Sequence, residues 1–279
     1  MFVSYASDEP IQHTGPVISA DHLKVTDNLR ICISGSTDGI CTFWAIIGST
    51  IPLNMEQTTS RFEFLRMNSI TWKPLICLTN SYRQCKYPIN SIVTQIWLTD
   101  DDENGKSTHY FIYIACGYEV WVLHIHLDYS ILTSEINVEN TIMQLFSTKG
   151  KLNISLSELS ALWTSEKVAE IKKYNLDHVV VQMSAISQQP GVISQCGVVA
   201  LLSNGEVVIM PYACEDDEFR HIRVQNDSLS NLWCTSLSTY AGGVLVAHAG
   251  SALFYPYADE KYHRKPSGLL ISAFSCQDY

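Results

Sequence analysis

A strand–turn–strand phrase recurs along the chain, and it constrains the fold more than any other feature. Its clearest copy covers residues 30–44, where an apolar run is followed by small residues, an Asp-Gly pair at 38–39 and a second run ending in Phe-Trp. An Asp-Gly pair supplies the positive φ angles that a two-residue hairpin turn requires. The runs are largely continuous in apolar residues, which is typical of strands buried on both faces. The phrase therefore predicts hairpins inside a layered β-structure.

Three looser copies follow, and the copies share a glycine at the turn. The turn glycines are Gly39, Gly117, Gly205 and Gly250. The last two are 45 residues apart, close to the 40–45 residues of a β-propeller blade, and the earlier intervals are about twice as long. Each long interval leaves room for a weaker hairpin, which we expect at residues 72–80 and 143–156. This count predicts about six blades.

The remaining strands of each blade are predicted beside these hairpins. Innermost strands are expected directly upstream, at 16–19, 89–97, 178–184 and 232–237. Outer strands are expected at 61–65, 221–224 and 269–274. The fold class that follows is all-β, a β-propeller of four-stranded antiparallel blades, about six or seven in number or an incomplete ring. Residues 1–279 would form one such domain or part of a larger propeller.

One segment departs from the strand pattern. Residues 157–174 place Leu159, Leu162 and Trp163 at helical spacing, behind a serine that suits a helix N-cap. We expect either a short helical insertion here or an outer strand followed by one short helix.

The stretch Ser-Gly-Ser-Thr-Asp-Gly-Ile-Cys-Thr-Phe-Trp, residues 34–44, resembles the closing half of a WD repeat. Trp44 stands where that motif places its aromatic residue, but Ala45 replaces the usual aspartate. The other copies keep the strand–turn–strand form without a Trp-Asp ending. The Gly-His pair that opens many WD repeats, and a complete Asp–His–Ser–Trp tetrad, are not evident. The resemblance implies a propeller fold and leaves function open, because WD-repeat propellers serve many roles.

A second resemblance concerns the order of the segments. A Thr-Asp-Gly blade, a polar loop and then Ile-Asn-Ser before further degenerate blades is similar to WD-repeat proteins that partner a tRNA ribose 2′-O-methyltransferase. That resemblance implies an accessory subunit whose contact with RNA is made through its partner.

Composition restricts the partners further. The formal net charge is −10, and phosphate binding requires clustered Lys and Arg, so we expect no direct nucleic-acid binding. The nine cysteines form no C-x-x-C pair, and most lie in apolar runs, which predicts buried, reduced thiols. The first residues suit no secretory leader and no apolar run suits a membrane span. We expect a cytoplasmic or nuclear protein without membrane insertion.

No nucleophile elbow, phosphate-binding loop or dinucleotide fingerprint occurs in the sequence. His124 and His126 would share a strand face, but no third metal ligand can be named. We therefore predict no catalytic residues, no metal, no cofactor and no small-molecule substrate.

Acidic and aromatic residues supply the candidate partner-binding positions. Two acidic segments are expected in loops, where negative charge would attract a basic partner segment. The C-terminal tyrosines are expected either at an interface or in closure of the last blade. These candidates are Asp100, Asp101, Asp102, Glu103, Glu215, Asp216, Asp217, Glu218, Tyr257 and Tyr262.

Three functions remain open from the sequence. The first is a non-catalytic scaffold that binds other protein subunits of a larger complex. The second is the accessory subunit of a tRNA-modifying complex. The third is a propeller enzyme with its site at the mouth of the central channel.

Overall fold

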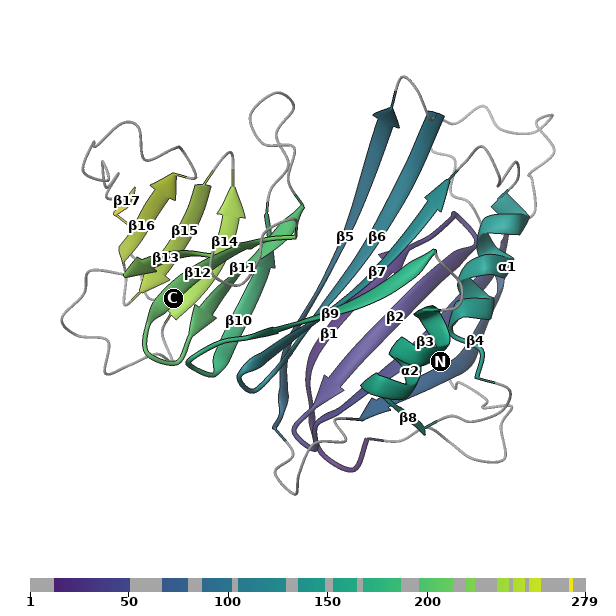
Figure 1. Cartoon of the computed structure of the whole chain (residues 1–279), viewed down its shortest axis with the longest axis horizontal. Coiled ribbons are helices and arrows are strands. Elements are labelled where there is room, and N and C mark those ends of the chain that lie inside the picture. The colour runs from purple at the N-terminus through teal and green to yellow at the C-terminus, as the bar shows by residue number, and fades with distance from the viewer. Residues whose placement is uncertain are drawn as a thin grey trace, which may run out of the picture. The chain divides into compact units, whose positions relative to one another are not determined.

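The chain folds into four β-sheets and two helices within the residues that the structure, a computed structural model, describes (Figure 1). Those residues are 13–50, 67–79, 87–101, 105–128, 135–148, 153–164, 168–186, 196–212, 219–223, 235–240, 243–248, 251–256 and 271–272.

The first sheet is an antiparallel meander with one added strand. Its strands follow one another in chain order, and the short β8 pairs with β4 in parallel. They are β1 (Val17–Lys24), β2 (Leu29–Ser36), β3 (Ile40–Thr50), β4 (Met67–Thr79) and β8 (Asn153–Ser155).

The second sheet has the order β5-β6-β7-β9, and both helices lie in the chain between β7 and β9. Its strands are β5 (Ile89–Asp101), β6 (Gly105–Cys116), β7 (Glu119–Asp128) and β9 (Ala169–Asn175).

The third and fourth sheets are simple four-stranded antiparallel meanders. The third sheet comprises β10 (Val180–Ala185), β11 (Gly197–Leu202), β12 (Glu206–Pro211) and β13 (Arg220–Arg223). The fourth comprises β14 (Thr235–Tyr240), β15 (Gly243–His248), β16 (Ser251–Pro256) and β17 (Ile271–Ser272).

The residues divide into two compact units, each described by itself below. Unit 1 comprises Met1–Ile89, Ile96–Ile112 and Leu123–Ile171. Unit 2 comprises Asn90–Gln95, Tyr113–Val122 and Lys172–Tyr279.

Three of the four predicted turn glycines have the backbone that the hairpins require. The φ angles are 76° at Gly39, 63° at Gly117 and 83° at Gly205. The amide of Gly205 donates to the carbonyl of Leu202 at 2.9 Å, which closes its turn. Gly250 lies outside the described residues, although β15 and β16 on either side of it are paired. The four hairpins predicted around these glycines are therefore confirmed as paired strands.

In unit 1, the helices α1 (Glu135–Leu145) and α2 (Leu156–Thr164) lie beside the first sheet (Figure 1). Phe146, just after α1, stacks on Phe43 of β3 with ring centroids 5.3 Å apart. Trp163 of α2 meets Phe146 edge-on at 5.6 Å and donates its indole N–H to the carbonyl of Leu145 at 2.9 Å. Aromatic packing thus fixes both helices over one face of the first sheet.

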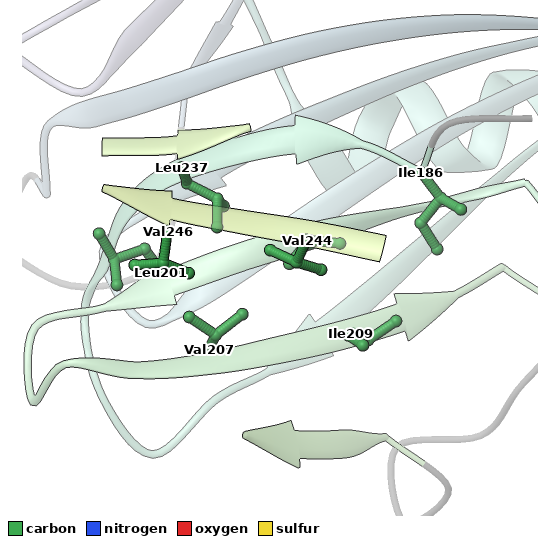
Figure 2. Close-up of a cluster of buried hydrophobic side chains, with 8 residues drawn as sticks. Ile186, Leu201, Val207, Ile209, Leu237, Val244 and Val246 are labelled. Carbon is green, nitrogen blue, oxygen red and sulfur yellow. The ribbon is translucent and has the colours of Figure 1, made fainter. Parts of the chain in front are cut away.

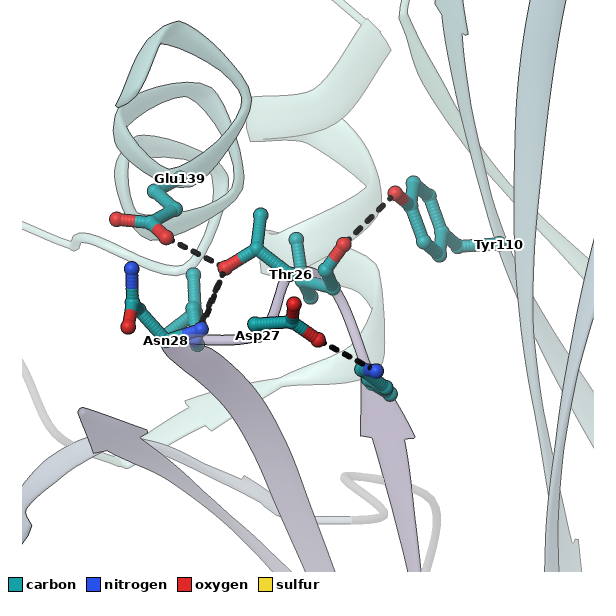
Figure 3. A network of polar contacts seen from close by, with 8 residues as sticks. Thr26, Asp27, Asn28, Tyr110 and Glu139 are labelled. Carbon is teal, nitrogen blue, oxygen red and sulfur yellow. Dashed lines mark hydrogen bonds and ion pairs between the residues drawn. The ribbon is translucent and has the colours of Figure 1, made fainter. Parts of the chain in front are cut away.

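The β1–β2 turn is fixed by polar contacts with other parts of unit 1 (Figure 3). The hydroxyl of Thr26 accepts the amide of Leu29 at 2.9 Å and lies 2.5 Å from a carboxylate oxygen of Glu139 on α1. Tyr110 of β6 reaches the carbonyl of Val25 at 3.5 Å. The turn therefore contacts both α1 and the second sheet.

Two weaker hairpins predicted from the spacing are wrong. Residues 72–79 belong to the single strand β4, whose 13 residues pair with β3 along most of its length. In the second predicted hairpin, residues 143–145 are instead the end of α1. Among the other described residues of this range up to 155, the three residues of β8 are strand. The described residues thus form four sheets, one of five strands and three of four, rather than six blades.

The predicted helical insertion is correct in its first half and wrong in its second. Residues 156–164 form α2, but residues 169–175 form β9, the last strand of the second sheet. In β9 Glu170 and Lys173 are exposed while Tyr174 is buried, as in an edge strand that is protected by charged residues. The helix α1 was not predicted, and the outer strand expected at 61–65 lies outside the described residues.

In unit 2, the third and fourth sheets share an aliphatic core (Figure 2). Every member is buried, and all are branched side chains that fit closely between pleated sheets. The cluster consists of Ile186, Val199, Leu201, Val207, Ile209, Leu237, Val244 and Val246.

Candidate binding surfaces

Most of the candidate positions predicted from charge and tyrosine content lie outside the described residues. Asp100 and Asp101 are the final residues of β5. The positions outside are Asp102, Glu103, Glu215, Asp216, Asp217, Glu218, Tyr257 and Tyr262. Their role in partner binding stays a prediction.

The turn of the first WD-like hairpin is organised around Asp38. One carboxylate oxygen accepts the amide of Thr14 at 2.6 Å, the Thr14 hydroxyl at 2.7 Å and the amide of Gly15 at 3.0 Å. The other accepts the amide of Ile40 at 3.0 Å and the hydroxyl of Ser36. Asp38 therefore joins the chain entering β1 to the β2–β3 turn.

These donors determine the charge state of Asp38. Burial alone would raise the pKa of its carboxyl, but the hydrogen bonds from Ser36, Thr14 and Ile40 outweigh burial and hold the pKa well below its usual range. The carboxylate is thus ionised across the physiological pH range.

A second set of bonds lies next to this turn. His13 Nε2 is 2.9 Å from the hydroxyl of Ser34 and 3.1 Å from that of Thr42, and the two hydroxyls are 2.6 Å apart. Burial lowers the pKa of His13, an effect that the charge of Asp38 partly opposes. His13, Ser34 and Thr42 are thus bonded to one another, and Asp38 makes a separate set of bonds at the adjoining turn. His13 was missed in the sequence because no glycine precedes it.

Polar side chains on the first strands of the first three sheets bond the backbone of the strand that begins the next sheet. In unit 1, the hydroxyl of Ser19 on β1 donates to the carbonyl of Ile89 at 2.7 Å. The approach is close, because a Cβ on Gly35 of β2 would lie 2.3 Å from a methyl of Ile89. The first sheet and the start of β5 are therefore in direct contact.

The same kind of bond recurs in unit 2 between β5 and β10. Asn90 donates to the carbonyl of Val180 at 2.8 Å, and the hydroxyl of Ser91 accepts the amide of Met183 at 2.9 Å. The buried amide of Gln95 donates to the carbonyl of Ile186 at 3.0 Å, and its oxygen accepts the Gly197 amide at 3.0 Å.

A side-chain bond between first strands also joins β10 and β14. The Gln182 side chain donates to the carbonyl of Leu237 at 3.3 Å and accepts the amide of the same residue at 3.1 Å. The hydroxyl of Thr239 bonds the carbonyl of Ala185 and lies 3.3 Å from the Ser184 hydroxyl. Consecutive first strands are thus joined by one recurring device, an amide or hydroxyl side chain bonded across to the neighbouring strand. The sequence signal is a Ser, Thr, Asn or Gln in each first strand.

The two faces of the first sheet differ in exposure. Alternate residues of β2 and β3, such as Ile31, Ile33 and Phe43, are fully buried. On the opposite face Thr42 is buried beside His13, Cys32, Trp44 and Ile46 are half-buried, and Trp72 of β4 is 41% exposed. This opposite face, here called the open face, carries side chains that are aligned across the strands: Ala20, His22, Lys24, Arg30, Cys32, Trp44, Ile46 and Trp72.

A row of imidazoles crosses the second sheet within unit 1. His109 Nδ1 is 3.0 Å from His124 Nε2, and His124 Nδ1 is 3.1 Å from a carboxylate oxygen of Glu170. The ring of His126 stacks on that of His109 at 4.4 Å. His124 and His126 therefore adjoin the same histidine, as expected from their spacing. Across the described ranges, no group of three or more His, Cys, Asp or Glu is arranged to hold a metal ion.

The described cysteines behave as core residues. Cys41, Cys77, Cys116 and Cys196 are buried and Cys32 is half-buried, all as free thiols. Burial raises the pKa of Cys77 and of Cys196 to about 12, which keeps both in the unreactive thiol form. No helix in the described part of the chain is long and apolar enough to span a membrane.

The similarities to known proteins found by comparison are distant. No protein-family model matches the chain, and no curated protein matches its sequence. Among solved structures, the WD40 domain of SCAP from fission yeast is 9% identical with a TM-score of 0.39, over 86% of this chain and 39% of that one. BBS1N in complex with ARL6DN is 9% identical with a TM-score of 0.37, over 90% and 66%.

A third structure, the complex of the SREBP–SCAP binding domains from fission yeast, is 13% identical with a TM-score of 0.36, over 90% and 60%. The chain thus spans 39% to 66% of the lengths of these structures. With TM-scores below 0.5, the likenesses do not by themselves establish a shared fold or function.

Proposed function

We propose that this chain is a non-catalytic, WD-repeat-like propeller scaffold that binds other protein subunits. The observation that carries the proposal is the recurring bond between consecutive first strands, which links four-stranded antiparallel sheets in chain order. Propeller blades adjoin in this way, through their innermost strands. The Asp38 and His13 networks give the first sheet the polar frame expected of a WD repeat.

The surface proposed for partners comprises the two acidic segments, residues 100–103 and 215–218. Their eight carboxylates would steer a basic peptide segment toward the scaffold at neutral pH and strengthen its docking at low salt. The net charge of −10 supports protein partners over nucleic acid.

A native pull-down with the tagged chain at two salt concentrations tests the proposal. We expect one stoichiometric protein partner, retained at low salt and weakened at high salt. The test variant replaces the eight acids of the two segments by their amides. The matched control is Asp177→Asn, which removes one exposed acid elsewhere.

Loss of the partner from the amide variant alone would support the acidic segments as the binding surface. Equal retention by both variants would remove these segments from the proposal. Absence of any stable partner at either salt concentration would contradict the scaffold function itself.

A further inference from the structure

Within unit 1, four polar side chains form one hydrogen-bonded chain across three strands of the second sheet. The ring of His109 on β6 lies in the middle, with Nε2 3.4 Å from the Ser107 hydroxyl and Nδ1 3.0 Å from Nε2 of His124 on β7. His124 Nδ1 is in turn 3.1 Å from a carboxylate oxygen of Glu170 on the edge strand β9. The side-chain bonds thus follow the order in which β6, β7 and β9 are paired.

The bonds determine how many protons the two rings can share. The Glu170 carboxylate only accepts, so Nδ1 of His124 carries a hydrogen. A single hydrogen then lies between His124 Nε2 and His109 Nδ1, donated by whichever ring holds it. If both rings were imidazolium, two N–H groups would face each other and this bond would be lost. The pair therefore keeps its geometry with no positive charge or with one, but not with two.

The surroundings favour the first charge and oppose the second. Glu170 places an opposite charge beside His124, whose side chain is only 11% exposed. The ring centroids of His109 and His124 are 5.2 Å apart, and the exposed His126 stacks on His109 at 4.4 Å. Positive charges at these separations repel each other. A second proton on the row therefore acts against both the hydrogen bond and the stacking of the rings.

An aromatic ring of β5 lies against the same histidine. The ring centroid of Trp97 is 5.5 Å from that of His109, and Trp97 is half-buried. His109 is also half-buried, so its ring has water within reach when the bond to His124 is lost, whereas the buried His124 stays beside Glu170. Turning the His109 ring outward would uncover part of Trp97.

Other charged residues lie further along the same strands. Lys172 comes two residues after Glu170 on β9, and its ammonium is 4.2 Å from the centre of the Tyr212 ring. Asp101 and Asp128 are the last residues of β5 and β7. Glu170 is the charged group bonded to an imidazole of the row, so its carboxylate decides where the first proton resides.

We propose that this row of imidazoles is a pH-sensitive switch, which holds one proton in the bonded form and releases the His109 ring from His124 and Trp97 when it takes up a second. Imidazoles ordinarily gain their charge between about pH 8 and 5, which is the range in which the switch acts. The surface that β5 and β6 present in unit 1 therefore differs between neutral and mildly acidic solution. The switch is independent of the acidic segments and of any protein partner.

An NMR titration of the full chain with labelled histidines, from about pH 8 to 5, tests the switch. We expect the ring signals of His109 and His124 to move together in two steps more than about one pH unit apart, because strongly interacting groups titrate as a pair. His109→Phe keeps an aromatic ring beside Trp97 but removes the nitrogen that bonds His124, so His124 should then titrate in one step. The matched control is His178→Phe, at an exposed position between β9 and β10, which should leave both steps unchanged.

The accessibility of Trp97 measures the release of the ring. Comparison with Trp97→Phe isolates the fluorescence of this tryptophan, and its quenching by acrylamide should rise across the second step but not across the first. In His109→Phe, measured against its own Trp97→Phe counterpart, the quenching should not change with pH. Far-UV circular dichroism should stay constant through both steps, because a side chain moves and the strands remain paired.

Glu170→Gln is a second test variant, at an exposed position, should His109→Phe fail to fold. Its amide oxygen still accepts a hydrogen bond from His124 but carries no charge, so the first step should move to lower pH by about one unit. Independent single steps for His109 and His124 in the wild type would overturn the proposal, and so would two steps that persist in His109→Phe. Constant quenching of Trp97 across the second step, or loss of circular dichroism there, would contradict release of the ring.

Discussion

The third and first sheets are built from the same hairpin but are covered differently. In β11 all six residues, Gly197–Leu202, are buried. In β2 the residues alternate, with Leu29, Ile31 and Ile33 buried and Arg30, Cys32 and Ser34 half-buried. The third sheet is therefore a two-sided interior layer, whereas the first is covered on one side by aromatic groups and is half-buried on its open face. Their stability should respond differently to the same kind of mutation.

The largest effect is expected for Leu201→Ala on β11. Deleting a fully buried leucine from the core between the third and fourth sheets should cost about 2–5 kcal/mol of unfolding free energy. The matched change on the open face, Cys32→Ala, should cost under about 1 kcal/mol, because that side chain is half-buried. Urea unfolding followed by circular dichroism measures both, and equal costs would show that the first sheet is covered on both faces.

Replacing glycine by alanine compares the third and first sheets at positions where a glycine lies close to neighbouring atoms. A Cβ at residue 197 would lie 2.4 Å from the backbone oxygen of Met210. Because a paired backbone atom cannot rotate away as a side chain can, Gly197→Ala should lower the unfolding free energy by about 1–3 kcal/mol. Gly35→Ala meets side-chain atoms of Ile89 and Ser19 instead and should cost less. Thermal unfolding of the two variants ranks them, and the reverse order would contradict a tighter third sheet.

Asp38→Asn should lower the unfolding free energy by about 1 kcal/mol at neutral pH, because the amide replaces charge-assisted hydrogen bonds of a half-exposed carboxylate with weaker neutral ones. The pKa of Asp38 is lower in the folded chain than in the unfolded one, so its stabilisation is complete above the unfolded value near 4 and declines as pH falls. Urea midpoints of the variant and wild type should therefore converge as pH is lowered from 5 to 2. A difference between the two urea midpoints that does not change with pH would exclude ionisation of Asp38 as the cause of the stability loss.

The smallest effect is expected at the start of β1. Val17 is 52% exposed, so Val17→Thr should change the unfolding free energy by less than about 0.5 kcal/mol. Differential scanning calorimetry detects a shift in midpoint, and a loss above 1 kcal/mol would mean that this end of the first sheet is buried in solution.

The hairpins were predictable because their signal is local. Asp-Gly at 38–39 and Asn-Gly at 204–205 determine turns through backbone angles alone, and both glycines have positive φ. The strands on either side of these turns are predicted by continuous apolar runs in the sequence. The four best hairpins, with the first strands upstream of them, were therefore identified from sequence.

The errors occurred where the sequence supports two local patterns. Residues 135–145 place Val138, Ile142 and Leu145 at helical spacing, and this signal was overlooked because the blade count required a hairpin nearby. Residues 169–175 were assigned to a helix because Val168 and Ile171 continue the helical spacing of the preceding apolar residues, whereas the strand form of β9 depends on pairing with β7. Tertiary pairing overrides local preference at such an edge.

The candidate surfaces were less predictable than the fold. Charge alone indicated the acidic segments, while the bonds between first strands depend on which strands adjoin, and no single strand shows this. Ser91 or Gln182 in isolation is an ordinary polar residue in a β-strand. The role of these residues in joining neighbouring sheets is recognised because such bonds recur from one sheet to the next.

The insertion between β7 and β9 has a consequence for synthesis on the ribosome. The second sheet cannot be completed until the 40 residues after Asp128 have emerged, since β9 begins at Ala169. At about 5–20 residues per second, β7 waits some 2–8 s for its neighbour. During that interval its free edge, which includes the apolar segment around Trp121 and Leu123, is open to pairing with another nascent chain. The nascent first half of this protein is therefore where a chaperone would be of most use.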